Sequence, residues 1–264
     1  MAIERHSSGS DVSLWTRNEK STAALREALP HCRVTTNLPD AVGQAEIVVL
    51  CTPPEAISGS GPLLAECLPA GACVTDAGSI KAQIVAALEP HLGGRFVGAH
   101  PMAGSEQSGI EAARANLFEG AACIITPTNL TDPDALATVR AFWAAAGCIL
   151  HEVTPSEHDR LLARISHLPH AAAAALVHTV IGLGEVVTHL AGNGYRDTTR
   201  IAAGPPDMWT EILLGNRADV ISAIDDLTGS LDGLKSALQN ADRPAVQRFL
   251  ELSSQSRMAQ RKPV

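Results

Sequence analysis

The chain has 264 residues, enough for one large domain or two modest ones, and its 45% hydrophobic and 18% charged residues are typical of a compact globular protein. Only 3% of the residues are aromatic, so Ala, Leu, Val and Ile must build the core. The net charge is −8, and basic residues cluster only in the short tail 257–264. This balance argues against a nucleic-acid partner and favours a small-molecule ligand.

The cysteines and the apolar segments indicate a reducing compartment and no membrane span. The six cysteines form no CxxC pair and mostly lie in apolar runs, so we expect free thiols, with neither a disulfide framework nor a metal site. Residues 1–12 lack the apolar core of a signal peptide. The longest apolar run, 171–177, is too short to cross a bilayer. We therefore predict a cytoplasmic protein.

The first half of the chain alternates short apolar segments with helical segments, which predicts βαβ units and an α/β fold with a doubly wound parallel sheet. In chain order, the predicted strands are 11–16, 33–36, 45–51, 72–75, 96–99, 121–126 and 148–153. The helices predicted between them are 19–29, 38–44, 56–68, 80–88, 109–116 and 133–146. The continuous apolar run at 45–51 is typical of a strand buried on both faces.

The pattern changes after Thr154. Pro155, Ser156 and Glu157 mark a helix start, and no further strand is predicted. Helices are predicted at 160–187, 206–214, 218–239 and 243–258. We therefore place a domain boundary near residue 153, with a Rossmann-type dinucleotide-binding domain at 1–153 and an all-helical domain at 154–264.

The glycine-rich loop that usually opens a dinucleotide-binding domain is missing. The chain begins directly before what reads as the second strand, and Gly59-Ser60-Gly61 is a poor substitute because Pro62 follows it. The absent first strand would lie between strands 11–16 and 45–51, and its loss would forfeit about 10 kcal/mol of apolar burial. We therefore expect an N-terminally incomplete sheet and an upstream segment lost before Met1.

His100 is the strongest candidate for chemistry. It lies where strand 96–99 ends, and Pro101 holds its backbone extended. Gly104 and Ser105 let the chain fold back, which brings Glu106 within reach of the imidazole. A histidine at the carboxyl end of a sheet strand with a nearby carboxylate is typical of a general base. A loop histidine bound by backbone carbonyls is the alternative.

Two positions near other strand ends have both structural and functional interpretations. Ser79 is a good N-cap for helix 80–88, and its hydroxyl can also face the cleft, whereas Lys81 is interpreted as a surface residue. Arg17 follows Thr16 at the place where NAD-preferring domains carry an acidic residue. An arginine there accommodates a 2′-phosphate, which slightly favours NADP, although a solvated arginine explains it nearly as well.

The helical half contributes three further candidates. Pro169 within a buried helix predicts a kink, and the adjoining His167 and His170 are interpreted as a site wall. Arg200 is a natural clamp for a substrate carboxylate, or the partner of an acidic neighbour. His151 and His158 are both interpreted as ordinary surface or hydrogen-bonded residues.

These segments together resemble the prephenate/arogenate dehydrogenase family of tyrosine biosynthesis. The matching segments, in family order, are TPP at 52–54, TDAGSIKA at 75–82, FVGAHPMAGSEQSG at 96–109, LFEGAACIITP at 117–127, EHDRLLARISHLPHAAAAAL at 157–176 and DTTRIAAGPPDMWTEIL at 197–213. The resemblance implies oxidative decarboxylation of prephenate or arogenate with hydride transfer to NAD or NADP. It also implies a homodimer through the helical domain.

The resemblance implies a role for each candidate. His100 would accept the hydroxyl proton of the substrate, and Ser79 would bind the same hydroxyl or orient His100. Arg200 would bind a substrate carboxylate. The pocket would be completed by Glu106, His167 and His170, and the cofactor would be held by Arg17, Thr52, Pro53 and Gly78.

Two alternatives remain. A truncated, non-catalytic dimeric protein of the same fold could bind a ligand without turnover. Another hydroxy-acid dehydrogenase with a helical second domain would usually carry a catalytic lysine there, and a histidine at the sheet edge disfavours it. The sequence leaves open prephenate against arogenate, NAD against NADP, and inhibition by tyrosine.

Overall fold

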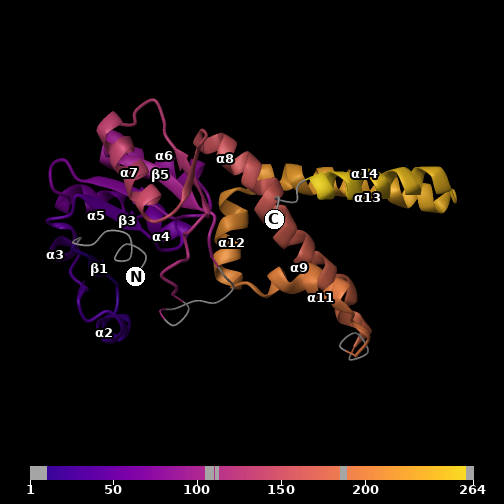
Figure 1. Cartoon of the computed structure of the whole chain (residues 1–264), viewed down its shortest axis with the longest axis horizontal. Coiled ribbons are helices and arrows are strands. Elements are labelled where there is room, and N and C mark those ends of the chain that lie inside the picture. The colour runs from indigo at the N-terminus through magenta and orange to yellow at the C-terminus, as the bar shows by residue number, and fades with distance from the viewer. Residues whose placement is uncertain (1–10, 105–109, 111–112, 185–188, 260–264) are drawn as a thin grey trace. The chain divides into compact units, whose positions relative to one another are not determined.

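The computed structural model describes residues 11–104, 110, 113–184 and 189–259. The chain forms two compact units, Met1–Arg217 and Ala218–Val264. The first unit holds every strand of the described residues (Figure 1). The functional boundary that the sequence places near residue 153 stays a prediction.

The strands of the first unit form two sheets. The smaller sheet pairs β1 (Ser13–Trp15) with β2 (Arg33–Thr35) in parallel. The larger sheet has the order β3-β4-β5-β6-β7. Its strands are β3 (Ile47–Leu50), β4 (Cys73–Asp76), β5 (Phe96–Pro101), β6 (Ala122–Thr126) and β7 (Ile149–Glu152). The α/β fold class with a helical second half is confirmed.

One strand pair departs from the predicted parallel arrangement, because β6 runs antiparallel to β5. A parallel neighbour requires a crossover connection, which is usually a helix. The helix expected at 109–116 lies partly outside the described residues, and residues 113–116 are not helical. The chain therefore turns back to β6, and the other pairs of the larger sheet stay parallel.

The two sheets separate between β1 and β3, at the position where the sequence predicts a further central strand. All four residues of β3 are half-buried, whereas all four of β4 are buried. The fully buried strands of the larger sheet are β4 and β5. The additional strand expected upstream of Met1 stays a prediction.

Helices cover both faces of the larger sheet, as a doubly wound fold requires. One face packs against α4 (Pro54–Ser58), α5 (Gly61–Cys67) and α6 (Ala82–Leu92). The other face packs against α7 (Pro133–Ala145). Alternate strand residues supply the two cores, so Val74 faces α6 while Cys73 belongs to the cluster around Trp143.

Local sequence explains where several helices begin. The side chain of Asn18 caps α2 (Glu19–Ala28), that of Asn37 caps α3 (Leu38–Val42), and that of Asp132 caps α7. The single helix predicted at 56–68 is two helices, because α4 ends at Gly59 and Pro62 lies in the first turn of α5. The six cysteines are free, as predicted.

The helical half begins with a nearly continuous run. Thr154 caps α8 (Pro155–Leu162), a π-helical turn spans Ala163–His167, and α9 covers Leu168–Val180. The π-helical turn is where the sequence predicts a kink, and it lies just before Pro169, which lacks an amide hydrogen. Short turns follow at Ile181–Leu183 and Arg200–Ala203, with α11 (Asn193–Thr199) and α12 (Pro206–Gly215).

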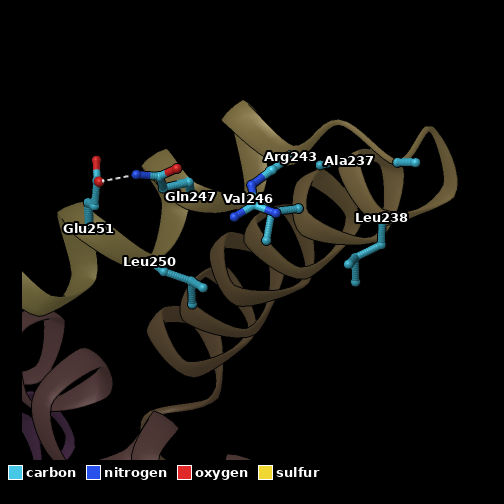
Figure 2. Close-up of a pocket in the computed structure, with 8 residues that line it drawn as sticks. Ala237, Leu238, Arg243, Val246, Gln247, Leu250 and Glu251 are labelled. Carbon is cyan, nitrogen blue, oxygen red and sulfur yellow. Dashed lines mark hydrogen bonds between the residues drawn. The ribbon is translucent and has the colours of Figure 1, made fainter.

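The second unit is a helical hairpin of α13 (Arg217–Gln239) and α14 (Arg243–Ala259) (Figures 1 and 2). The hairpin turns at Ala241, whose φ of 52° is left-handed, and the side chain of Asp242 accepts a hydrogen bond from Ala245 N at the start of α14. No residue of α14 is buried. Within the described residues, no helix has both the length and the apolar character needed to cross a membrane.

Candidate active site

A buried ion pair lies beneath the carboxyl end of β5. The Lys81 ammonium contacts the Asp76 carboxylate, and both side chains are fully buried. Lys81 Nζ also donates to the carbonyl of Ala99 at 2.8 Å, and Ala99 N donates to Asp76 Oδ1 at 3.0 Å. The pair therefore fixes both backbone groups of the residue before His100. The prediction that Lys81 is a surface residue was wrong.

The N-terminus of α6 is capped by Asp159, a residue of α8 that is 77 positions away along the chain from Ala82. Asp159 Oδ1 accepts from Lys81 N at 2.7 Å and Oδ2 from Ala82 N at 2.9 Å. The prediction that Ser79 caps this helix was therefore wrong, because the helix begins two residues later than expected, at Ala82. A carboxylate at a helix N-terminus satisfies free amides and complements the helix dipole.

Two histidines connect this carboxylate to the end of β5. His158 Nδ1 lies 2.8 Å from Asp159 Oδ1, and His158 Nε2 lies 2.9 Å from His100 Nδ1. The exposed fraction is 8% for His100 and 0% for His158. His158, interpreted from sequence as ordinary, is therefore a direct partner of the candidate base.

His167 and His170 lie beside this chain of hydrogen bonds. His167 Nδ1 lies 3.2 Å from Asn216 Nδ2, and the same amide donates to the Asp159 carbonyl at 2.8 Å. His170 stacks on Trp209, with ring centroids 3.6 Å apart. Among the described residues, neither His167 Nε2 nor His170 Nδ1 has a partner in hydrogen-bond geometry. Both atoms are buried, and the backbone of Ser79 lies close to the His167 ring.

Burial keeps the imidazoles of the site neutral near pH 7. Burial lowers the pKa of His100 well below 6.5, and the neighbouring His158 and Lys81 add to this effect. Burial also lowers the pKa of His158, although Asp159 opposes it. Burial lowers the pKa of His167 to about 4, against an opposing contribution from Asp159. A neutral imidazole can accept a proton, so His100 is suited to act as a base.

The turn after β4 carries the predicted residues Gly78 and Ser79. Gly78 is buried, and an added Cβ would lie 2.7 Å from Ile84 Cδ1 and 2.8 Å from Asp76 Oδ2, which explains the glycine by packing. Ser79 is half-buried, and its backbone lies close enough to His167 to favour the charged imidazole. The structure therefore brings this turn and His167 together.

The predicted cofactor residues lie at strand ends. Thr52 and Pro53 are exposed where β3 ends, and Arg17 is exposed just after β1. Open α/β sheets bind ligands outside the carboxyl ends of their strands. The parallel strands β3 and β4 end at one edge, so the exposed Thr52-Pro53 segment and the turn at Gly78 lie at the same edge of the sheet.

The remaining predicted residues are Arg200 and Glu106. Arg200 is exposed at the start of the turn Arg200–Ala203, which packs against α9, the helix that carries His170. Glu106 lies outside the described residues. Among the residues that the structure describes, no group of three or more His, Cys, Asp or Glu side chains could hold a metal ion.

The sequence interpretation missed Asp159 and His158 for a geometric reason. Nine residues separate His158 from His167, which is about two and a half α-helical turns and would put them on opposite faces. The π-helical turn at 163–167 changes this phase, and both rings are buried next to Asp159. Pro169 indicated the kink but not the role of His158, because the contact of His158 with His100 joins two different elements.

Comparisons with known proteins place the chain among relatives of one enzyme family. A family model described as "Prephenate dehydrogenase, nucleotide-binding domain" matches residues 1–151, and one described as "Prephenate dehydrogenase, dimerization domain" matches residues 154–252. The cyclohexadienyl dehydrogenase of Zymomonas mobilis is 30% identical over 254 residues, which cover 94% of this chain and 86% of that protein.

Two solved structures are similar along nearly the whole chain. The crystal structure of prephenate dehydrogenase from A. aeolicus in complex with hydroxyphenyl propionate and NAD+ has a TM-score of 0.90 at 33% identity, covering 98% of this chain and 92% of that one. Synechocystis arogenate dehydrogenase has a TM-score of 0.84 at 30% identity, covering 98% of this chain and 94% of that one.

The lowered histidine pKa values predict a loss of stability in acid. An unfolded histidine titrates near pH 6.5, whereas His167 in the folded protein titrates at about 4. Below pH 6.5 the unfolded chain binds more protons, so the free energy of unfolding falls between about pH 6.5 and 4. Urea unfolding across this range measures the slope, and His167→Gln should make it shallower.

The control for this measurement is His91→Gln, which removes an exposed imidazole at the end of α6 and should keep the wild-type slope. A wild-type stability that does not change between pH 6.5 and 4 would contradict the prediction.

Proposed function

Because the chain belongs to the prephenate dehydrogenase family, we propose that it catalyses the oxidative decarboxylation of prephenate or arogenate in tyrosine biosynthesis. The observation that carries this proposal is the neutral, buried imidazole of His100 at the end of β5, held in a chain of polar contacts that spans the sheet and the helical half. The reaction makes 4-hydroxyphenylpyruvate from prephenate or tyrosine from arogenate.

His100 moves one proton in this reaction. The imidazole accepts the proton of the ring hydroxyl as that carbon is oxidised to a ketone. The bond from the ring to its carboxylate then breaks, carbon dioxide leaves, and the bonding electron pair makes the ring aromatic. The resulting phenolate takes the proton back from His100, so the base is regenerated. A bound NAD(P) supplies the two-electron oxidation by taking up a hydride.

We assign the cofactor to the edge formed by β3 and the turn after β4. Thr52 and Pro53 are exposed there, and the glycine at position 78 keeps the turn tightly packed. Either NAD or NADP fits this assignment. The exposed guanidinium of Arg17 favours NADP, because it can pair with a 2′-phosphate.

The substrate contacts come from the turn after β4 and from the helical half. Ser79 binds the substrate hydroxyl or orients His100, and His167 and His170 present buried ring nitrogens without partners among the described residues. Arg200 binds a substrate carboxylate as a charge-assisted pair. The family resemblance also assigns Glu106 to discrimination of the substrate side chain.

We also propose that the protein works as a cytoplasmic homodimer formed through its helical region, where the matching family model is described as a dimerization domain. The hairpin of the second unit exposes large apolar side chains; these include Leu231, Leu238, Leu250, Leu252 and Met258. A groove lined by α13 and α14 residues lies on this hairpin, and Leu238 and Leu250 are among them (Figure 2). A second copy would bury this surface, since monomers rarely leave so much of it in water.

An activity assay tests the function. Purified protein is given prephenate or arogenate, each with NAD or NADP, and reduced nicotinamide is followed by absorbance. We expect turnover with at least one combination, and His100→Asn should lower kcat about 10²–10⁴-fold because the base is lost. No turnover with any combination, despite bound cofactor, would instead indicate a non-catalytic ligand-binding protein.

A second variant tests the carboxylate clamp. Arg200→Ala should raise the KM for the substrate about tenfold or more with a smaller change in kcat, since losing a charge-assisted pair costs about 1.5–3 kcal/mol. The control is Arg160→Ala, which removes an exposed arginine of α8 and should leave the KM unchanged. An unchanged KM in Arg200→Ala would remove Arg200 from the site.

Sedimentation equilibrium tests the dimer. We expect the wild-type protein to be a dimer at micromolar concentration, and Leu250→Glu to weaken it because a charge would replace a buried apolar contact. Gln255→Glu adds the same charge at an exposed polar position of α14 and should leave the dimer intact. A monomeric wild-type protein would contradict this assignment.

A further inference from the structure

We propose that His158 and Asp159 are positioning residues that fix the tautomer of His100, so that its Nε2 is the atom that accepts the substrate proton. This inference rests on the function proposed above. It goes beyond that function by assigning a role to two residues of α8 that the proposed reaction leaves without one.

The argument begins at the carboxylate of Asp159. A carboxylate can only accept hydrogen bonds, and Asp159 already accepts from the amides of Lys81 and Ala82 at the start of α6. His158 Nδ1, at 2.8 Å from Asp159 Oδ1, must therefore carry the hydrogen and donate it. In a neutral imidazole the other nitrogen is then an acceptor, so His158 Nε2 has a lone pair.

The same rule determines the state of His100. Its Nδ1 lies 2.9 Å from His158 Nε2, so the hydrogen of that contact must come from His100 Nδ1. The Nε2 of His100 then carries the lone pair. The chain of contacts has a single direction, from His100 through His158 to Asp159, and it leaves the outer nitrogen of His100 ready to accept a proton.

The opposite direction would require a charged His158 that donates from both nitrogens. Burial opposes this state, because the side chain of His158 is fully buried and its pKa is lowered. A positive charge would also lie close to the buried ammonium of Lys81. Among the described residues, the ionisable groups that act electrostatically on the His100–His158 pair are Asp76, Lys81, Asp159 and His167.

The arrangement also supports His100 after it has accepted the proton. The imidazolium keeps its Nδ1 hydrogen bond to His158, which in turn donates to Asp159. Hydrogen bonds in a low-dielectric interior polarise one another, so the negative charge of Asp159 stabilises the charged ring through His158. Neither residue needs to touch the substrate for this effect.

The first test reads the wild-type protein directly and uses a variant only to assign the signals. The two ring nitrogens of His100 are observed by ¹⁵N NMR in histidine-labelled protein at pH 7.5, with signals assigned by their loss in His100→Asn. We expect a protonated Nδ1 and an unprotonated Nε2. A protonated Nε2 would overturn the proposal.

The second test compares two substitutions of His158 by kinetics. His158→Phe keeps a planar ring but offers no acceptor, and we expect kcat to fall about 10–100-fold, less than the loss of the base itself. His158→Gln keeps an amide oxygen that can accept from His100 Nδ1, and it should recover most of this loss. Equal losses in both variants, or no loss in His158→Phe, would overturn the proposal.

Two controls separate this proposal from its premise. His151→Phe makes the same substitution at an exposed histidine of β7 and should leave kcat unchanged. His100→Asn tests the premise independently: if it retains wild-type kcat, His100 is not the base and the proposed function fails. If His100→Asn is inactive but the His158 variants behave alike, only the positioning role fails.

Discussion

The structure of the site depends on the carboxylate of Asp159, which caps a helix and also contacts a histidine of the site. Asp159 accepts hydrogen bonds from two amides at the N-terminus of α6 and one from the ring of His158. The first contacts join the helical half to the sheet, and the last orients the residue that contacts His100. Because the same side chain makes both sets of contacts, the position of α8 against α6 and the orientation of His158 beside His100 cannot vary independently.

Burial determines the charge of the site. The Lys81–Asp76 pair is fully enclosed and would cost stability if either partner were removed, since the other would be left as an unpaired buried charge. The imidazoles nearby respond to the same environment by staying neutral. The buried pair thus holds the strand end in place, while the neutral rings nearby remain able to accept protons.

Particular residues show how far local reasoning reaches. His100 could be found because Pro101 and the end of a buried strand are local signals, and His167 because Pro169 is a local anomaly. Lys81 and His158 could not be found, because their roles depend on partners from other elements: Asp76 for the first and His100 for the second. Ser79 was predicted to cap α6, whereas Asp159 caps this helix from the other half of the chain.

The sequence by itself determined the family, the alternation of strands and helices, the helical second half and the position of His100 at the end of a buried strand. These properties follow from hydrophobic periodicity and from motifs of consecutive residues. Both can be read without knowing which elements pack against each other. The tertiary structure decided the antiparallel turn into β6, the capping of α6 by α8 and the contact between His100 and His158. Those features join residues from different elements, and only the packing of the sheet against the helices brings their atoms within hydrogen-bond distance.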